Sequence, residues 1–119
     1  MAGDQRTELE GTNKALHDLY RALFEGQKLA TFVGTGINVS TTSAVVLGTN
    51  NNRLYALLVN DSDTVIYLKL GATAVANSDI RLNAAGGSYE IDWTNLFRGA
   101  IYGISTADAK KISLIEGTL

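Results

Sequence analysis

The sequence predicts a mainly β protein: an antiparallel β-sandwich or jelly-roll-like barrel of seven to eight short strands, with an N-terminal amphipathic helix. From about residue 29 onward, runs of β-branched, aromatic and leucine residues alternate with Gly, Asn, Asp, Ser and Thr. Turn residues that recur about every 8–12 positions are typical of a sandwich or a jelly roll. We therefore assign residues 1–28 to an N-terminal arm and helix for docking or oligomerisation, and residues 29–119 to the β-sandwich domain.

The helix is predicted from a capping box and an apolar stripe. Thr7 and Glu10 have capping-box spacing, and Gly26 lies where a C-terminal cap is expected. The stripe repeats at helical intervals and is our candidate protein interface: Leu9, Leu16, Leu19, Tyr20, Leu23 and Phe24. Such a stripe must be buried. Its partner is either the outer face of strand 54–59 in the same chain or another chain, and we expect the second.

Seven to eight strands are expected in the β domain. Their ranges are 29–33, 43–47, 54–59, 64–70, 80–82, 88–93, 99–105 and 110–116, with turns at 34–36 and 40–42. Strand 54–59 is apolar on both faces, which indicates a central strand that is covered on both sides. The polar residues 60–63 predict that it forms an antiparallel hairpin with 64–70. Within 88–93, alternation predicts that Trp93 points inward and that Glu90 and Asp92 point outward.

Composition excludes several classes of function. The chain has 119 residues, a net charge of −2 and no run of basic residues, so we expect neither nucleic-acid binding nor attachment to an anionic membrane. It has no cysteine, which excludes disulfides. No apolar run approaches the roughly 20 residues that span a bilayer. The polar start of the chain lacks the features of a signal peptide, so we expect the protein to be made and assembled inside a cell.

No residue pattern indicates a catalytic, cofactor or metal site. His17 is the one histidine and has no nucleophile motif beside it. Glu90 and Asp92 have the chemistry of a glycosidase pair, but we interpret them as the solvated face of a strand. Asp61 and Asp63 lack the spacing of a calcium loop. Aromatic residues that could stack on a sugar are spread over different strands: Tyr55, Tyr67, Tyr89, Trp93 and Tyr102.

Several segments together resemble a known group of proteins. They are RLYALLVN at 53–60, VIYLKLG at 65–71, IRLNAAGG at 80–87, SYEID at 88–92 and GAIYGI at 99–104. An Arg-led strand that ends in Asn, a Tyr-Leu strand, a turn that ends in Gly-Gly and a late Gly-Ala-Ile-Tyr strand are similar to small β-rich virion proteins of tailed bacteriophages. The likeness extends from about residue 53 to 116, so the N-terminal helix lies outside it.

This resemblance implies a non-enzymatic structural protein, most specifically a capsid decoration or cement protein on the head shell. Its expected partners are the major capsid protein or other virion proteins, and further copies of itself as a dimer or trimer. The expected location is the virion, assembled in the host cytoplasm. Two alternatives stay open. One is a neck, tail or fibre component, and the other is a carbohydrate-binding module that uses the aromatic residues with Glu90 and Asp92.

Overall fold

The computed structural model describes residues 13–19, which are helical, and residues 31–118. The second range contains eight strands. They are β1 (Thr31–Val39), β2 (Ala44–Leu47), β3 (Arg53–Asn60), β4 (Ile66–Leu70), β5 (Ile80–Leu82), β6 (Ser88–Ile91), β7 (Ile101–Ser105) and β8 (Lys110–Thr118).

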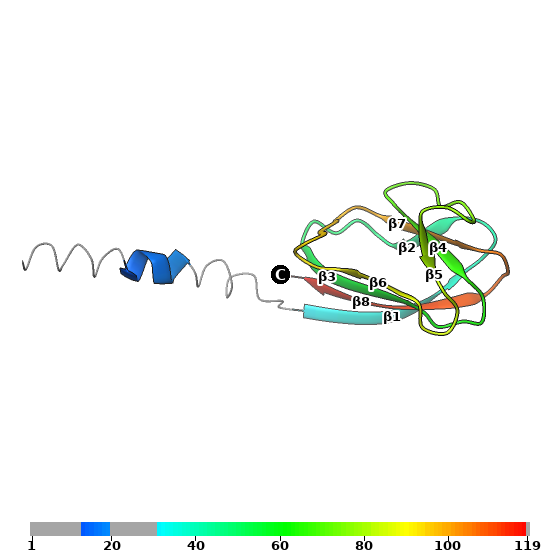
Figure 1. Cartoon of the computed structure of the whole chain (residues 1–119), viewed down its shortest axis with the longest axis horizontal. Coiled ribbons are helices and arrows are strands. Elements are labelled where there is room, and N and C mark those ends of the chain that lie inside the picture. The colour runs from blue at the N-terminus through cyan, green and yellow to red at the C-terminus, as the bar shows by residue number, and fades with distance from the viewer. Residues whose placement is uncertain (1–12, 20–30, 119) are drawn as a thin grey trace, which may run out of the picture.

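The strands form two antiparallel sheets that face each other as a sandwich (Figure 1). Sheet A has the order β1-β8-β3-β6, and sheet B has the order β2-β7-β4-β5. This is the strand order of a jelly roll, in which most connections pass from one sheet to the other. The two sheets do not close into a barrel, so the predicted antiparallel sandwich is confirmed.

The core lies between the sheets and is built from alternate residues of each strand. Ala56 and Leu58 of β3 meet Ile66 and Leu68 of β4, and all four are fully buried. Other members of this core are Val39, Val46, Leu47, Leu82, Ile91, Ile101, Ile112 and Leu114. Among the described residues, every buried side-chain nitrogen or oxygen has a hydrogen-bond partner. The core between the sheets is therefore apolar, and the polar side-chain atoms buried in the described chain are hydrogen-bonded.

The expected hairpin between 54–59 and 64–70 is wrong, because the two strands belong to different sheets. β3 pairs with β8 and β6, whereas β4 pairs with β7 and β5. The connection is directed by Asn60, which is fully buried. Its side-chain Nδ2 donates to the carbonyls of Thr64, at 2.7 Å, and Leu82, at 3.0 Å. Those bonds hold the end of β3 against sheet B, so the polar segment becomes a crossover between layers.

Two local predictions are also wrong. Gly34 and Gly36 do not form a turn but lie within β1, opposite Ile115 and Ser113 of β8. Neither glycine has a positive φ, so both are compatible with a strand. Trp93 does not point inward, because β6 ends at Ile91 and the Trp93 side chain is 83% exposed. A turn that begins at residue 92 replaces the last two positions of the expected strand.

Arg53 fastens the opposite end of β3 to sheet B. Its side chain is fully buried, and its Nε donates to Glu116 of β8 at 2.6 Å. Nη1 donates to the carbonyls of Phe97, at 2.9 Å, and Gly99, at 3.0 Å, while Nη2 donates to the carbonyl of Gly48. These carbonyls lie in the segments that leave β2 and enter β7. One guanidinium therefore joins both layers.

The core assignment predicts the effect of truncating Leu58 or Leu68. Each replacement by Ala should lower the free energy of unfolding by about 2–5 kcal/mol, because a fully buried leucine leaves a cavity. Urea titration measures this loss. Val75→Ala is the matched control, since Val75 is 55% exposed and its truncation should cost little. A loss below about 0.5 kcal/mol for either leucine would contradict the packing, given the cost of a buried cavity.

The network around Arg53 predicts a second stability effect. Arg53→Met keeps much of the side-chain volume but leaves the Glu116 carboxylate and three carbonyls without this donor. Breaking a buried ion pair on one side typically costs about 3–5 kcal/mol. Urea unfolding of the variant should show a loss of that size, while Arg81→Met, at an exposed position, should stay near wild type. If the two variants had equal free energies of unfolding, the buried network of Arg53 would not be important for stability.

Candidate functional site

The face of sheet A that points away from sheet B carries an apolar surface. The strand register places five side chains on this face, from three adjacent strands: Phe32, Tyr55, Leu57, Val59 and Ile115. We call these residues the outer patch. Leu57 and Ile115 are directly opposite each other on β3 and β8. Phe32 is 54% exposed and the other four are partly exposed, and no layer of the described chain packs over them.

Phe32 and Tyr55 form the aromatic end of the outer patch. Their ring centroids are 6.3 Å apart with an interplanar angle of 61°, an edge-to-face arrangement. Gly117 of β8 is opposite both residues in the register and has no side chain to separate the rings. The hydroxyl of Tyr55 donates to Glu90 on β6 at 2.7 Å. That bond, together with the negative charge, raises the pKa of Tyr55.

Glu90 and Asp92 do not act as a pair. Glu90 accepts the hydrogen bond from Tyr55 on the outer face of sheet A. Asp92 instead accepts hydrogen bonds from the backbone N–H of Thr94, at 2.8 Å, and from its hydroxyl. These bonds hold the pKa of Asp92 below its usual value. Both carboxylates thus accept hydrogen bonds from neighbouring residues, and Asp92 lies beyond the end of β6 rather than on its face.

The turn after β6 presents apolar side chains at the end of the sandwich. The Asn95 side chain accepts from the N–H of Asp92 and donates to the carbonyl of Glu90, each at 2.8 Å. The turn is therefore held by several local hydrogen bonds. It carries Trp93, 83% exposed, and Leu96, 39% exposed. A fixed, exposed tryptophan is the type of residue that anchors protein interfaces or stacks on sugar rings.

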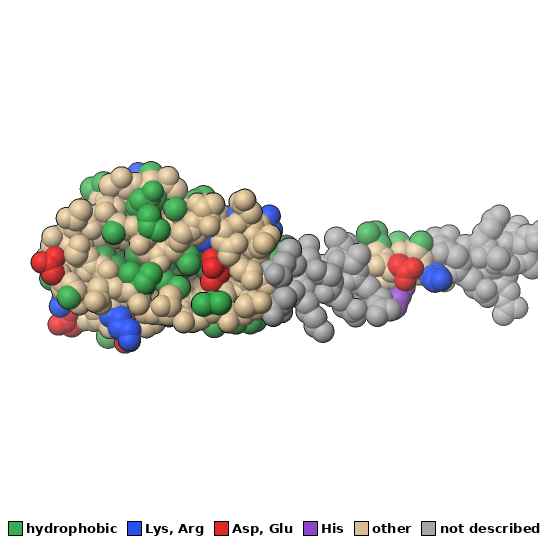
Figure 2. All heavy atoms as spheres, turned by 180° about the vertical axis from the view of Figure 1, so that it is seen from behind, with side chains coloured by type: hydrophobic (Ala, Val, Ile, Leu, Met, Phe, Trp, Pro, Cys, Tyr) green, Lys and Arg blue, Asp and Glu red, His purple; other side chains and the backbone are tan. Residues whose placement is uncertain are grey.

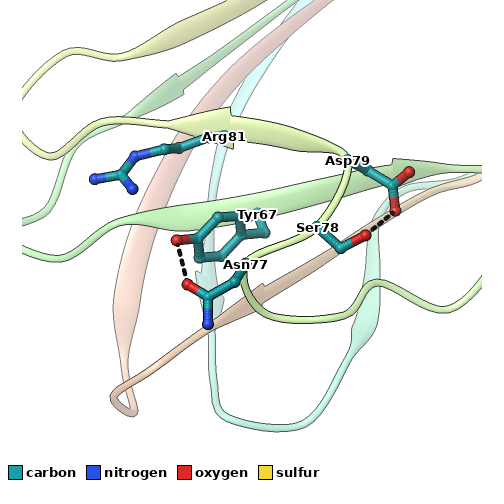
Figure 3. Close-up of a pocket in the computed structure, with 5 residues that line it drawn as sticks. All are labelled: Tyr67, Asn77, Ser78, Asp79 and Arg81. Atoms are coloured by element: carbon teal, nitrogen blue, oxygen red, sulfur yellow. Dashed lines mark hydrogen bonds between the residues drawn. The ribbon is translucent and has the colours of Figure 1, made fainter.

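A small hollow lies on the outer side of sheet B, beneath the loop that joins β4 to β5 (Figure 3). It is lined by Tyr67, Asn77, Ser78, Asp79 and Arg81 and has a volume of about 220 Å³. The hydroxyl of Tyr67 donates to Oδ1 of Asn77 at 2.8 Å. Ligand pockets usually measure about 300–1,000 Å³ and are mostly apolar. This polar hollow is smaller, so the outer patch is the better candidate site.

The helical segment 13–19 carries two of the six residues predicted as an interface. Leu16 is 60% exposed and Leu19 is 56% exposed. Figure 2 shows hydrophobic side chains on one side of this segment and charged and histidine side chains on the other. His17 is exposed, as expected of a solvent-facing helix residue. Four predicted interface residues lie outside the described residues: Leu9, Tyr20, Leu23 and Phe24. The boundary between the two predicted domains lies outside them as well.

The aspartates before β4 are engaged by lysines of β8. Asp63 accepts from Nζ of Lys110 at 2.7 Å, and this bond lowers the pKa of Asp63. Asp61 and Lys111 are 4.0 Å apart.

Residues 13–19 and 31–118 contain no group of three or more His, Cys, Asp or Glu side chains that could hold a metal ion. No helix within these ranges is long and apolar enough to cross a membrane.

Neither a protein-family model nor a curated protein sequence matches the chain. Two solved structures show a low similarity to the chain. One comes from Bacillus endospore appendages, described as a novel family of disulfide-linked pili. It is 20% identical with a TM-score of 0.47, and the match covers 75% of this chain and 86% of that chain. FixK2 from Bradyrhizobium japonicum is 15% identical with a TM-score of 0.33, covering 71% and 39% respectively. These similarities are too low to bear on function.

The bond between Tyr55 and Glu90 predicts a pKa change in a variant. Glu90→Gln removes the negative charge, so ionised Tyr55 no longer faces a carboxylate. The pKa of Tyr55 should fall toward its ordinary value of 10.0. NMR titration with ring-labelled tyrosine measures it. Asp92→Asn is the control and should have a smaller effect, because Asp92 contributes least to the shift. An unchanged pKa in Glu90→Gln would contradict the contact, and both variants should fold and assemble normally.

Proposed function

We propose that the protein is a non-enzymatic structural protein of a tailed-phage virion, most specifically a capsid decoration or cement protein that binds the head shell. The observation that carries the proposal is the apolar surface on both described parts of the chain. The sandwich carries the outer patch, and the helical segment carries Leu16 and Leu19. In this role, these surfaces bind the major capsid protein, other virion proteins or further copies of the chain.

The energetics support attachment through these surfaces. Burying one large apolar side chain stabilises an interface by about 1.5–3 kcal/mol. Contiguous exposed apolar groups on a soluble domain commonly mark an interaction site. The outer patch joins such side chains from β1, β8 and β3 on one continuous sheet. An amphipathic helix on an apolar surface is a recurring mode of recognition. The described chain contains both parts of this mode, because the helical segment carries Leu16 and Leu19 and sheet A carries the outer patch.

The residues of the phage-like segments support the fold on which this proposal depends. Arg53 and Asn60, which begin and end the first segment, are the two buried polar anchors of β3. In the Gly-Gly turn, Gly86 has φ of +118°, and a Cβ on Gly87 would lie 2.3 Å from the backbone nitrogen of Asn83. Jelly rolls occur in viral capsid proteins and also in lectins. The fold is thus compatible with a virion role without excluding sugar binding.

Sugar binding is the second candidate, and the exposure of Trp93 is the observation that favours it. The other aromatic residues lie on different faces of the sandwich. Tyr55 lies on the outer face of sheet A, while Tyr67 is buried on sheet B beside the polar hollow. Tyr89 packs against the core. A single exposed tryptophan suits a protein contact as well as a sugar, so the structural role is preferred. A neck, tail or fibre location would use the same surfaces.

The proposal predicts that charge on the helix stripe abolishes attachment. Leu16→Asp combined with Leu19→Asp should eliminate cosedimentation with expanded capsid shells, because carboxylates cannot be buried against an apolar partner without large cost. The melting temperature of the β domain should not change. Asn13→Asp with His17→Asp is the control, since it adds the same number of negative charges at other positions of the segment. It should leave shell binding near wild type.

Two results would overturn this prediction. If the leucine variant unfolds the whole domain as a monomer, the helix belongs to the intramolecular core. If the variant binds shells as well as wild type does, the helix is not the docking element. Trp93→Ala tests the alternative: loss of binding to a polysaccharide panel, with shell binding intact, would favour the carbohydrate-binding module.

A further inference from the structure

The free edge of β1 lacks the features that usually prevent a strand from pairing with another chain. The two sheets expose four edge strands: β1, β6, β2 and β5. Three are short. β6 has four residues and carries Glu90, β5 has three and carries Arg81, and β2 has four with an irregularity between Val45 and Leu47. Short length, charge and bulges are protective devices. β1 instead has nine residues and an unbroken register with β8, and contains neither proline nor charge.

Over its first six residues, the outward side of β1 is accessible on both faces of the sheet. Phe32 and Val33 point to opposite faces and are 54% and 56% exposed. Within the described ranges, the backbone hydrogen bonds of β1 are those to β8. Alternate N–H and C=O groups therefore face away from the sheet over the whole strand. A second extended strand could accept and donate those bonds and cover both exposed side chains.

Gly34 provides an independent indication of close approach. It lies mid-strand without a positive φ, so its backbone conformation does not require glycine. A Cβ at this position would meet only the carbonyl oxygen of Leu114 at 3.9 Å, which is an ordinary contact. Nothing in the described chain therefore needs a glycine here. Glycine inside a strand often marks a place where another backbone comes near.

We propose that two copies of the chain pair antiparallel through β1, so that their two four-stranded sheets A become one continuous sheet. Full overlap places Thr35 on a two-fold axis perpendicular to the sheet. In this register Val33 lies opposite the partner's Ile37. A two-fold axis closes the pair without any second surface. This surface is separate from the helix and shares only Phe32 with the outer patch. The inference does not depend on the proposed function.

A second copy is the occupant that β1 fits best. The strand is uncharged, so two copies meet without electrostatic repulsion. Its two ends are also complementary. The Val39 end is covered by β7, because Val39 is 2% exposed and approaches Gly103. The first six residues of β1 are exposed. Antiparallel overlap lays the exposed first residues of each strand beside residues 37–39 of the other copy, so that Ile37 lies opposite Val33.

Charge at the axis tests the proposal. Thr35 is exposed, so Thr35→Lys and Thr35→Glu should fold normally, as circular dichroism will show. Each variant places like charges together and should weaken dimerisation by about ten-fold or more. Mixing the two variants in equal amounts should restore a dimer, because Lys then faces Glu. Sedimentation equilibrium of the full chain, repeated in the Leu16→Asp, Leu19→Asp background, separates this contact from helix association. Thr73→Lys on an exposed loop is the control.

A cross-link tests the register. The chain has no cysteine, so Thr35→Cys introduces a single thiol per copy. Mild oxidation should yield a disulfide-linked dimer, whereas Ser88→Cys on the β6 edge should not. The proposal is overturned if the chain that carries only Leu16→Asp and Leu19→Asp, with Thr35 unchanged, stays monomeric at high micromolar concentration. It is also overturned if Thr35→Lys dimerises as well as wild type, or if the mixed Lys and Glu variants remain monomeric.

Discussion

The buried guanidinium of Arg53 is the interaction on which the arrangement of the two sheets depends. A charge this deeply buried is tolerated only when it is paired and each of its nitrogens has a hydrogen-bond acceptor. Glu116 pairs with it inside sheet A, and the carbonyls of Gly48, Phe97 and Gly99 accept from it at the ends of β2 and β7. Asn60 makes the corresponding connection at the far end of β3. Both ends of one strand thus set where sheet B lies.

Arg53 and Asn60 connect sheet A to sheet B through its inner face. The outer face of sheet A and its β1 edge are therefore left for other contacts. The outer patch offers side chains, with Phe32 and Tyr55 in edge-to-face contact. The β1 edge offers backbone groups over nine residues. The helical segment offers Leu16 and Leu19. In the proposed virion role, one surface can hold the shell while another joins copies, and linked weak contacts then act together. Such division of contacts suits a protein that reinforces an assembly.

Part of this candidate site was readable from local pattern. Helical spacing selected Leu16 and Leu19, and both are exposed. The run 54–59 is apolar on both faces and was therefore expected to be covered on both sides. Tyr55, Leu57 and Val59 are instead partly exposed, and no layer of the described chain covers them. Phe32 and Ile115 were not predicted as members, because only pairing with β8 brings them beside that run. Trp93 was wrongly predicted to point inward because β6 ends early. The N–H of Thr94 donates to Asp92 and the N–H of Asp92 donates to Asn95, and alternation alone cannot detect these bonds.

Strand positions and inward residues follow from the order of amino acids, because alternation, apolar runs and turn residues act over a few neighbours. Leu58, Leu68 and Ile91 lie at alternating positions of such apolar runs and are fully buried. Strand partners do not follow, since each strand would satisfy its pattern beside any antiparallel neighbour. The residues 60–63 suit a tight hairpin and a crossover equally well. The crossover forms because buried Asn60 donates to the carbonyls of Thr64 and of Leu82 in sheet B. These contacts exist only once both sheets have formed.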